Sequence, residues 1–219
     1  MAAGVNTPRH FPSPARAERL GLLLVGGKLS PDWLLDAYSH GIFPWPLYDG
    51  TLAWWSPDPR AVIEFDQFHV SRRLERTCRG GAFEITRDRA FDAVIEACGS
   101  VGSRRRGTWL TPPMLAAYKR LHRLGHAHSV EAWQDGELAG GVYGLAVGGM
   151  FSAESMFYRR RDASKVALAA LVRLLQERGY ALLDIQQLTP HTARMGASEI
   201  PRKEFLIRVA EAVARDVAF

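Results

Sequence analysis

Residues 126–158 read HAHSVEAWQDGELAGGVYGLAVGGMFSAESMFY, and this stretch decides the fold. Its pattern is typical of three consecutive strands. Asp135 and Gly136 form the dipeptide that favours a two-residue hairpin turn between the first two strands. The stretch therefore predicts a meander of three strands.

Other elements follow on both sides of this meander. ASKVALAALVRLLQERG, residues 163–179, is a strongly amphipathic pattern ended by Gly179, which predicts a helix. Further strands are predicted at residues 60–65, 83–88 and 181–187, and further helices at residues 89–99, 111–125 (with Thr111 as N-cap) and 202–217. The order predicts a mixed α/β sheet with helices on both faces, an α+β fold with the element order of an acetyltransferase-like domain.

The first 58 residues have a different composition, rich in Pro, Gly and Trp. They contain one predicted helix, residues 30–41, with Ser30 as N-cap and Pro31 at its first position. Residues 41–60 carry three tryptophans and are predicted to be a loop region. Because this segment is short for a core of its own, we expect a small N-terminal domain, residues 1–58, docked on a larger one, residues 59–219.

Composition limits the class of protein. Of the 219 residues, 47% are hydrophobic and 23% are charged, which is typical of a globular protein. No apolar run has the length of a membrane span, and the N-terminus lacks the order of a secretory signal. Cys78 and Cys98 have neither metal-ligand spacing nor the density of a disulfide scaffold. We expect a cytoplasmic protein whose cysteines serve packing.

Positive charge is concentrated in runs of arginine. The net charge is +5, and arginines cluster at positions 72–73, 104–106 and 159–161. Such clusters favour a polyanionic partner, RNA first, although solvated surface explains many of them equally well. Charge alone leaves both interpretations open.

Two predicted strands carry carboxylates among apolar residues. Asp184 and Gln186 lie two residues apart, so they point to the same face of their strand. Burial of an unpaired carboxylate is costly, so each needs a partner, either a neighbouring loop or a substrate. Glu154 poses the same choice between an internal Arg or Lys and a substrate cation.

Several stretches together resemble leucyl/phenylalanyl-tRNA–protein transferases. The most specific are GIFPW (41–45), WWSPDPR (54–60), GHAHSVE (125–131), the pair ESMF and ASK (154–165), and DIQ with HTA and EIPR (184–202). The resemblance extends from about His10 to Phe205. It implies a small N-terminal domain, an acetyltransferase-like C-terminal domain, and a monomer. It also implies transfer of Leu or Phe, with Met a further donor, from aminoacyl-tRNA to the N-terminal amine of proteins that begin with Arg or Lys, which marks them for degradation.

The resemblance gives the polar residues roles. In this chemistry an amine attacks an aminoacyl ester and sheds a proton. We expect Asp184 to act as the base or proton relay and Gln186 to position the amine. Glu154 is the third active-site position, where it recognises the substrate's cation or holds its amine.

The resemblance also implies binding residues. Trp45 and Trp109 face each other and stack on the terminal adenosine of tRNA, where other proteins would use them in a core. Val142, Phe151 and Leu171 line the aminoacyl pocket, unless they are ordinary core. The residues expected to reach tRNA phosphates are Arg104, Arg105, Arg106, Arg159, Arg160, Arg161 and Lys165. Lys165 has the alternative of pairing with an acidic neighbour.

No cofactor and no metal is expected. His122, His126 and His128 favour a structural interpretation because no ligand set accompanies them. An acyl-CoA N-acetyltransferase would need a glycine-bearing pyrophosphate loop, and RRRDASKVAL at 159–168 lacks its glycines. A non-catalytic RNA-binding module and a peptidyl transferase acting on cell-wall precursors are the remaining alternatives. The Glu154, Asp184 and Gln186 set argues against the first, and the GIFPW and WWSPDPR blocks argue against the second.

Overall fold

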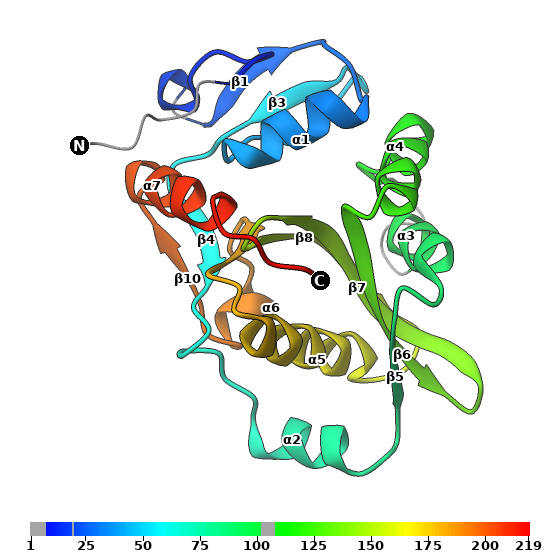
Figure 1. The fold of residues 1–219 in the computed structure, drawn as a ribbon. Helices are drawn as coiled ribbons and strands as arrows, with labels where there is room; N and C mark the ends of the chain where they lie inside the picture. The colour runs from blue at the N-terminus through cyan, green and yellow to red at the C-terminus, as the bar shows by residue number, and fades with distance from the viewer. Residues whose placement is uncertain (1–7, 19, 102–107) are drawn as a thin grey trace.

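A seven-stranded sheet forms the centre of the computed structural model, which describes residues 8–18, 20–101 and 108–219 (Figure 1). Its strand order is β10-β4-β9-β8-β7-β6-β5. The strands are β4 (Arg60–Ile63), β5 (Glu84–Arg87), β6 (Ala127–Gln134), β7 (Glu137–Val147), β8 (Met150–Tyr158), β9 (Leu182–Gln186) and β10 (Ala197–Ile200). Neighbouring strands are antiparallel except β8 and β9, which are parallel. The mixed α+β class is confirmed.

The predicted meander is β6, β7 and β8. Asp135 and Gly136 connect β6 to β7, and both have a positive φ, 54° and 77°. A two-residue hairpin turn of the favoured type needs this left-handed conformation at both positions. The Asp-Gly signal therefore predicted the turn correctly.

Helices cover both faces of the sheet, as predicted. α5 (Ala163–Arg178) links β8 to β9 and packs on β6, β7 and β8, and α2 (Arg72–Arg79) packs on α5. The opposite face carries α1 (Pro31–Ser39), α3 (Phe91–Ser100), α4 (Pro112–Arg123) and α7 (Arg202–Val213) (Figure 1). α5 ends at Gly179, which adopts the left-handed conformation with φ 79°.

The N-terminal segment forms a second, smaller sheet. It has the order β1-β3-β2, with β1 (Leu22–Val25), β2 (Phe43–Pro44) and β3 (Ala53–Trp55). The predicted loop region, residues 41–60, therefore contains two short strands, β2 and β3, that had not been predicted. These strands are very short, and they exist because β3 pairs with both neighbours rather than because of a local pattern.

The two sheets share one buried core. Leu34, Tyr38 and Trp54 of the N-terminal segment belong to the same apolar cluster as Tyr118 and Phe205. The Phe205 ring lies so close to Gly41 that a Cβ there would be 2.8 Å from it. The expected docking of this segment on the rest follows from these contacts, and a domain boundary at residue 58 stays a prediction.

The remaining short elements had not been predicted. They are η1 (Pro14–Arg16), α6 (Pro190–Ala193), β1, α2 and β10. Among the helices of the described residues, none has the length and apolar character needed to cross a bilayer.

Candidate functional site

The candidate site lies where two parallel strands part. The ladder between β8 and β9 ends at the pair Ser152–Asp184, although β8 continues to Tyr158 and β9 to Gln186. Residues just beyond that pair line a pocket together with residues of the N-terminal segment. The lining residues are Phe43, Trp45, Trp109, Val142, Ala153, Glu154, Ser155, Met156, Leu168, Ile185, Gln186, Gln187, Thr189 and Thr192.

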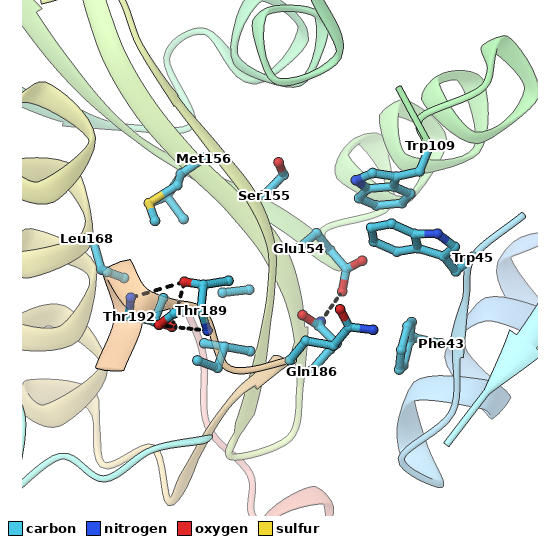
Figure 2. A pocket seen from close by; sticks show the side chains of 14 residues that line it. Phe43, Trp45, Trp109, Glu154, Ser155, Met156, Leu168, Gln186, Thr189 and Thr192 are labelled. Carbon is cyan, nitrogen blue, oxygen red and sulfur yellow. Dashed lines mark hydrogen bonds between the residues drawn. The ribbon is translucent and has the colours of Figure 1, made fainter. Parts of the chain in front are cut away.

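The two ends of the pocket differ in chemistry (Figure 2). Trp45, Trp109 and Phe43 form an aromatic end, and Met156 and Leu168 form an aliphatic end. Glu154 and Gln186 lie between the two ends. An apolar pocket with a few polar groups in its middle is the usual form of a binding site that orients one reacting group.

Arg60 stands opposite Asp184 and gives this carboxylate its partner. Both side chains are 1% exposed. The Arg60 Nε donates to Asp184 Oδ1 at 2.8 Å, and Nη2 donates to Oδ2 at 2.6 Å. The guanidinium lies between the rings of Phe43 and Phe205, with 4.7 and 4.5 Å from Cζ to the ring centroids. This bidentate, fully buried geometry is the arrangement that best offsets the cost of desolvating two charges.

Asp184 is consequently occupied on both oxygens. The backbone N–H of Gln186 also donates to Oδ1 at 3.0 Å, and the Ser152 hydroxyl donates to Oδ2 at 3.1 Å. Asp184 is not among the residues that line the pocket. The predicted role of Asp184 as a base that meets the substrate amine directly does not fit this geometry. The other part of this expectation, a proton relay, stays a prediction.

Glu154 is the carboxylate that faces the pocket. Its Oε1 accepts from Gln186 Nε2 at 2.9 Å and from Ser152 Oγ at 3.2 Å, and its Oε2 accepts from the Tyr118 hydroxyl at 3.2 Å. Tyr38, in α1, bonds the Tyr118 hydroxyl at 2.7 Å. Burial, and less strongly the charge of Asp184, raise the pKa of Glu154, whereas the surrounding hydroxyls lower it, and the balance puts it at about 7. Glu154 thus gains or loses its proton near neutral pH.

Gln186 is held in an unusual conformation at the end of β9. Its φ is +60°, in the left-handed region that a residue other than glycine rarely adopts. Its Nε2 donates to both Ser152 Oγ and Glu154 Oε1 at 2.9 Å. Ser152 contacts both Asp184 and Gln186, and the predicted partnership of these two residues in catalysis stays a prediction.

Trp45 and Trp109 contact each other directly. Their rings are stacked with centroids 4.6 Å apart and planes inclined by 16°. Trp45 follows β2 and Trp109 precedes α4, so the pair joins the N-terminal segment to the larger part of the chain. Trp45 is 38% exposed, so part of it is accessible to a ligand.

Of the three residues predicted to line the aminoacyl pocket, only one lines the pocket of the structure. Val142 lines the pocket. Phe151 and Leu171 do not line it, and their place in an aminoacyl pocket stays a prediction. Phe151 stacks on Phe219, and Leu171 lies almost one turn of α5 beyond Leu168, inside the core. The positions facing the pocket are instead Met156, Leu168 and Ile185.

The predicted basic residues lie in two regions. Arg104, Arg105 and Arg106 fall outside the described residues. Arg159, Arg160 and Arg161 are exposed just before α5. Arg161 and Lys165 line a hollow that shares Met156 and Thr189 with the pocket, at its aliphatic end.

Lys165 pairs with an acidic neighbour, which is one of the two alternatives that the sequence left open. Its Nζ is 3.7 Å from Asp162 Oδ1, and Asp162 also binds Arg73 through both oxygens. Asp162 precedes α5 and places an anion at the start of this helix, where its charge is favourable. An acyl-CoA pyrophosphate would meet this carboxylate at the same place, which adds to the missing glycines.

Two of the three histidines near β6 lie beside one carboxylate, that of Asp88. Asp88 accepts from His128 Nδ1 at 2.8 Å and lies 3.9 Å from His122 Nδ1. Within residues 8–18, 20–101 and 108–219, no group of three or more His, Cys, Asp or Glu side chains has the arrangement of a metal site.

Sequence reasoning missed four residues of this site: Arg60, Ser152, Tyr38 and Tyr118. Arg60 is 124 positions from Asp184, so no local pattern joins them. The signal for Arg60 was its place at the head of a strand of apolar residues, where a cation needs a buried anion.

Comparison with known proteins decides the family. Residues 62–210 match the family described as leucyl/phenylalanyl-tRNA protein transferase, and residues 27–58 match the N-terminal domain of the same family. The chain belongs to the leucyl/phenylalanyl-tRNA–protein transferase family. Its expected resemblance is confirmed, and the chain is an aminoacyltransferase of this family.

Similar family members come from several bacteria. The leucyl/phenylalanyl-tRNA–protein transferase of Anaeromyxobacter sp. (strain Fw109-5) is 53% identical over 206 residues, 94% of this chain and 88% of that protein. The protein of the same name from Azoarcus sp. (strain BH72) is 52% identical over 197 residues, 89% of this chain and 84% of that protein. This family member thus matches both over most of their lengths.

Solved structures that resemble this family member include acetyltransferases. A GCN5-related N-acetyltransferase-like protein from Streptococcus suis is 13% identical, with a TM-score of 0.41 over 82% of this chain and 79% of that one. A ribosomal-protein-alanine N-acetyltransferase from Brucella melitensis is 17% identical, with a TM-score of 0.38 over 52% of this chain and 87% of that one.

Proposed function

We propose that this family member transfers leucine or phenylalanine from aminoacyl-tRNA to the N-terminal α-amine of proteins that begin with Arg or Lys, in the cytoplasm and as a monomer, and thereby marks them for degradation. Methionine is a further donor in this proposal. The observation that carries it is the pocket itself, in which Glu154 and Gln186 lie between an aromatic end and an aliphatic end. The end of an aminoacyl-tRNA, with its terminal adenine on one side and an apolar aminoacyl side chain on the other, fits that division.

The aliphatic end supports an uncharged aminoacyl side chain. Met156 and Leu168 lie there, Val142 pairs with Met156 across the β7–β8 ladder, and none of these side chains carries a formal charge. A Leu or Phe side chain buried there gains from the removal of apolar surface from water, whereas a charged side chain would lose its hydration.

The aromatic end supports stacking of the terminal adenine. An unpaired base presents its π-face, and stacking on tryptophan accepts any base and is strong enough to hold it in place. Because Trp45 and Trp109 touch in the free protein, the base either stacks on the exposed face of Trp45 or parts the two rings.

The transfer step needs a single proton acceptor beside the amine. The amine nitrogen attacks the ester carbonyl carbon, a C–N bond forms, and the C–O bond to the ribose breaks. The nitrogen loses a proton, and the departing ribose oxygen gains one. In our proposal Glu154, whose pKa is about 7, takes the first proton and returns it to the ribose oxygen, so that none is gained or lost overall.

Gln186 and Asp184 support that exchange in different ways. The Gln186 amide lines the pocket and orients the Glu154 carboxylate. Asp184 holds the Gln186 backbone N–H and fixes the strand end on which this amide stands. Since an aminoacyl ester is already activated, positioning carries much of the acceleration.

Transfer of radiolabelled leucine or phenylalanine from charged tRNA tests the proposal. Acceptors are one protein prepared with Arg, Lys or Ala as its first residue. We expect label on the Arg and Lys forms, little on the Ala form, and a loss of about 10²–10⁴-fold in Glu154→Gln. Equal labelling of all three acceptors would contradict the acceptor rule, and no labelling with charged tRNA still bound would leave an RNA-binding module.

A further inference from the structure

Ser152 is a buried hydroxyl that lies between the two carboxylates of the site. It is 0% exposed and stands in β8 directly beside Asp184 of β9, at the last pair of their ladder. Its Oγ is 3.1 Å from Asp184 Oδ2 and 3.2 Å from Glu154 Oε1. The proposed transfer step gives this hydroxyl no task.

One hydrogen atom has to serve two acceptors. A serine hydroxyl donates a single hydrogen bond and accepts through its lone pairs. Gln186 Nε2 already donates to the Oγ at 2.9 Å, so the oxygen is held in place while its hydrogen remains free to point to either carboxylate. Ser152 therefore donates to Asp184 or to Glu154, and to one of them at a time.

The surroundings of the two carboxylates are unequal. Asp184 keeps three other donors, the Nε and Nη2 of Arg60 and the backbone N–H of Gln186. Glu154 is faced by Tyr118 from α4, with Tyr38 of α1 behind it, and by the Gln186 amide from β9. Burial holds the pKa of both tyrosines well above the usual value, so they act as neutral donors throughout.

Resting on the proposed transfer reaction, we propose that Ser152 is a positioning residue whose hydroxyl turns from Asp184 to Glu154 when Glu154 is ionised and back to Asp184 when Glu154 is protonated. In the ionised state the hydroxyl hydrogen stabilises the Glu154 carboxylate. In the protonated state the carboxyl hydrogen bonds the Ser152 oxygen, whose own hydrogen then points to Asp184. No covalent bond changes at Ser152; only its O–H rotates.

The chain provides a matched control for this hydroxyl. Ser129 in β6 is also buried, and it donates to Glu131, two residues further along its strand, as Ser152 does to Glu154. Ser129 and Glu131 are absent from the residues that line the pocket. Loss of the Ser129 hydroxyl reports what removal of a strand serine beside a glutamate costs in general.

The test compares Ser152→Ala, Ser129→Ala and Ser152→Cys in the full chain. In Ser152→Ala we expect the pKa of Glu154 to rise by about 0.5–1 unit, because its charged form loses a donor. The acidic limb of kcat/KM moves upward with it, and kcat falls by about tenfold with KM for aminoacyl-tRNA nearly unchanged. Ser152→Cys keeps a weak donor, so its acidic limb should lie between those of the unaltered protein and Ser152→Ala. Ser129→Ala should leave the limb in place.

A second readout separates this inference from the proposed function. The titration of the Glu154 carboxyl, followed by carbon NMR and assigned with Glu154→Gln, needs no transferase activity. A Glu154 titration that stays unchanged in Ser152→Ala, or that shifts equally in Ser129→Ala, would overturn the positioning role. A shifted titration without any transfer activity in the unaltered protein would support the role of Ser152 and refute the proposed reaction.

Discussion

At the scale of single residues, the buried Arg60–Asp184 ion pair holds the strands of the site together, and both of its charges are shielded from water. Removal of one partner from such a pair costs more than the pair contributes, because the other charge stays buried alone. We expect Arg60→Met to lower the free energy of unfolding by about 3–5 kcal/mol, measured by urea denaturation at pH 7.

The cause can be separated from lost packing. Asp184→Asn in the Arg60→Met background removes the orphaned charge and should recover a large part of the loss. Arg79→Met is the matched control: its guanidinium pairs with Glu75 but is 75% exposed, so the change should cost less than about 1 kcal/mol. A loss in Arg60→Met as small as in this control would contradict the argument.

Glu154 makes the stability of the protein depend on pH. Its pKa is raised from 4.5 to about 7, so between these values the folded protein keeps a proton that the unfolded chain releases. This contribution is fully present below about pH 4.5 and is lost as the pH rises through about 7. Because Glu154→Gln is neutral at every pH, its stability relative to the unaltered protein should increase from pH 5 to pH 8.

Urea denaturation at both pH values measures that difference. Glu137→Gln, at the exposed start of β7, is the control and should show no comparable increase. A Glu154→Gln variant that gained nothing between pH 5 and pH 8 would mean that the folded protein holds the Glu154 proton no more tightly than the unfolded chain does.

At the scale of elements, local signals predicted what local interactions stabilise. The hairpin at Asp135 and Gly136 and the end of α5 at Gly179 depend on the conformation of those residues alone, and the sequence displayed them. β3 pairs with β1 and β10 pairs with β4, partners far along the chain, and β2 has only two residues; none of the three carries a comparable pattern. The site divides likewise: Glu154 and Gln186 interrupt apolar strands visibly, whereas Ser152 and Arg60 matter through contacts that only the folded chain makes.

β7 contains a glycine that the site requires. A Cβ at Gly144 would lie 2.2 Å from the Ser152 carbonyl oxygen and 2.5 Å from the Phe151 ring, where the β7–β8 register shifts. We expect Gly144→Ala to destabilise the protein by about 1–3 kcal/mol and to lower transfer activity, because β8 must move together with Ser152 and Glu154. Urea denaturation and the labelled-leucine assay measure the two effects.

Gly99→Ala in α3 is the control for this change. Its nearest neighbour, Leu110 Cβ, is 3.8 Å from the added carbon, so there is room for it. Alanine in a helix should leave the stability unchanged or increase it by up to about 1 kcal/mol. Equal effects of the two variants would show that close approach of β8 is not what Gly144 permits.

At the scale of the whole molecule, the site exists because the N-terminal segment and the larger part of the chain are packed together. Trp45 and Trp109 meet across that contact, and Arg60 Nη1 donates to the Gly41 carbonyl oxygen at 3.2 Å. Arg202 of α7 makes a second contact between the two parts, in which its Nη1 donates to the Ser56 carbonyl oxygen at 2.7 Å. The aromatic end of the pocket therefore keeps its place only while both parts are folded.

The shared core predicts one cooperative unfolding transition. Four of the six tryptophans, Trp33, Trp45, Trp54 and Trp55, lie in the N-terminal segment, so fluorescence reports mainly on that part. Far-ultraviolet circular dichroism reports mainly on the helices, most of which lie in the larger part. We expect the two urea curves to coincide, as in a two-state transition. In Arg202→Ala both midpoints should fall together, because the lost hydrogen bond to Ser56 joins the two parts of one cooperative unit. A fluorescence change that precedes the loss of dichroism would instead show that the N-terminal segment unfolds by itself, and the aromatic end of the pocket would then open without unfolding of the sheet that carries Glu154.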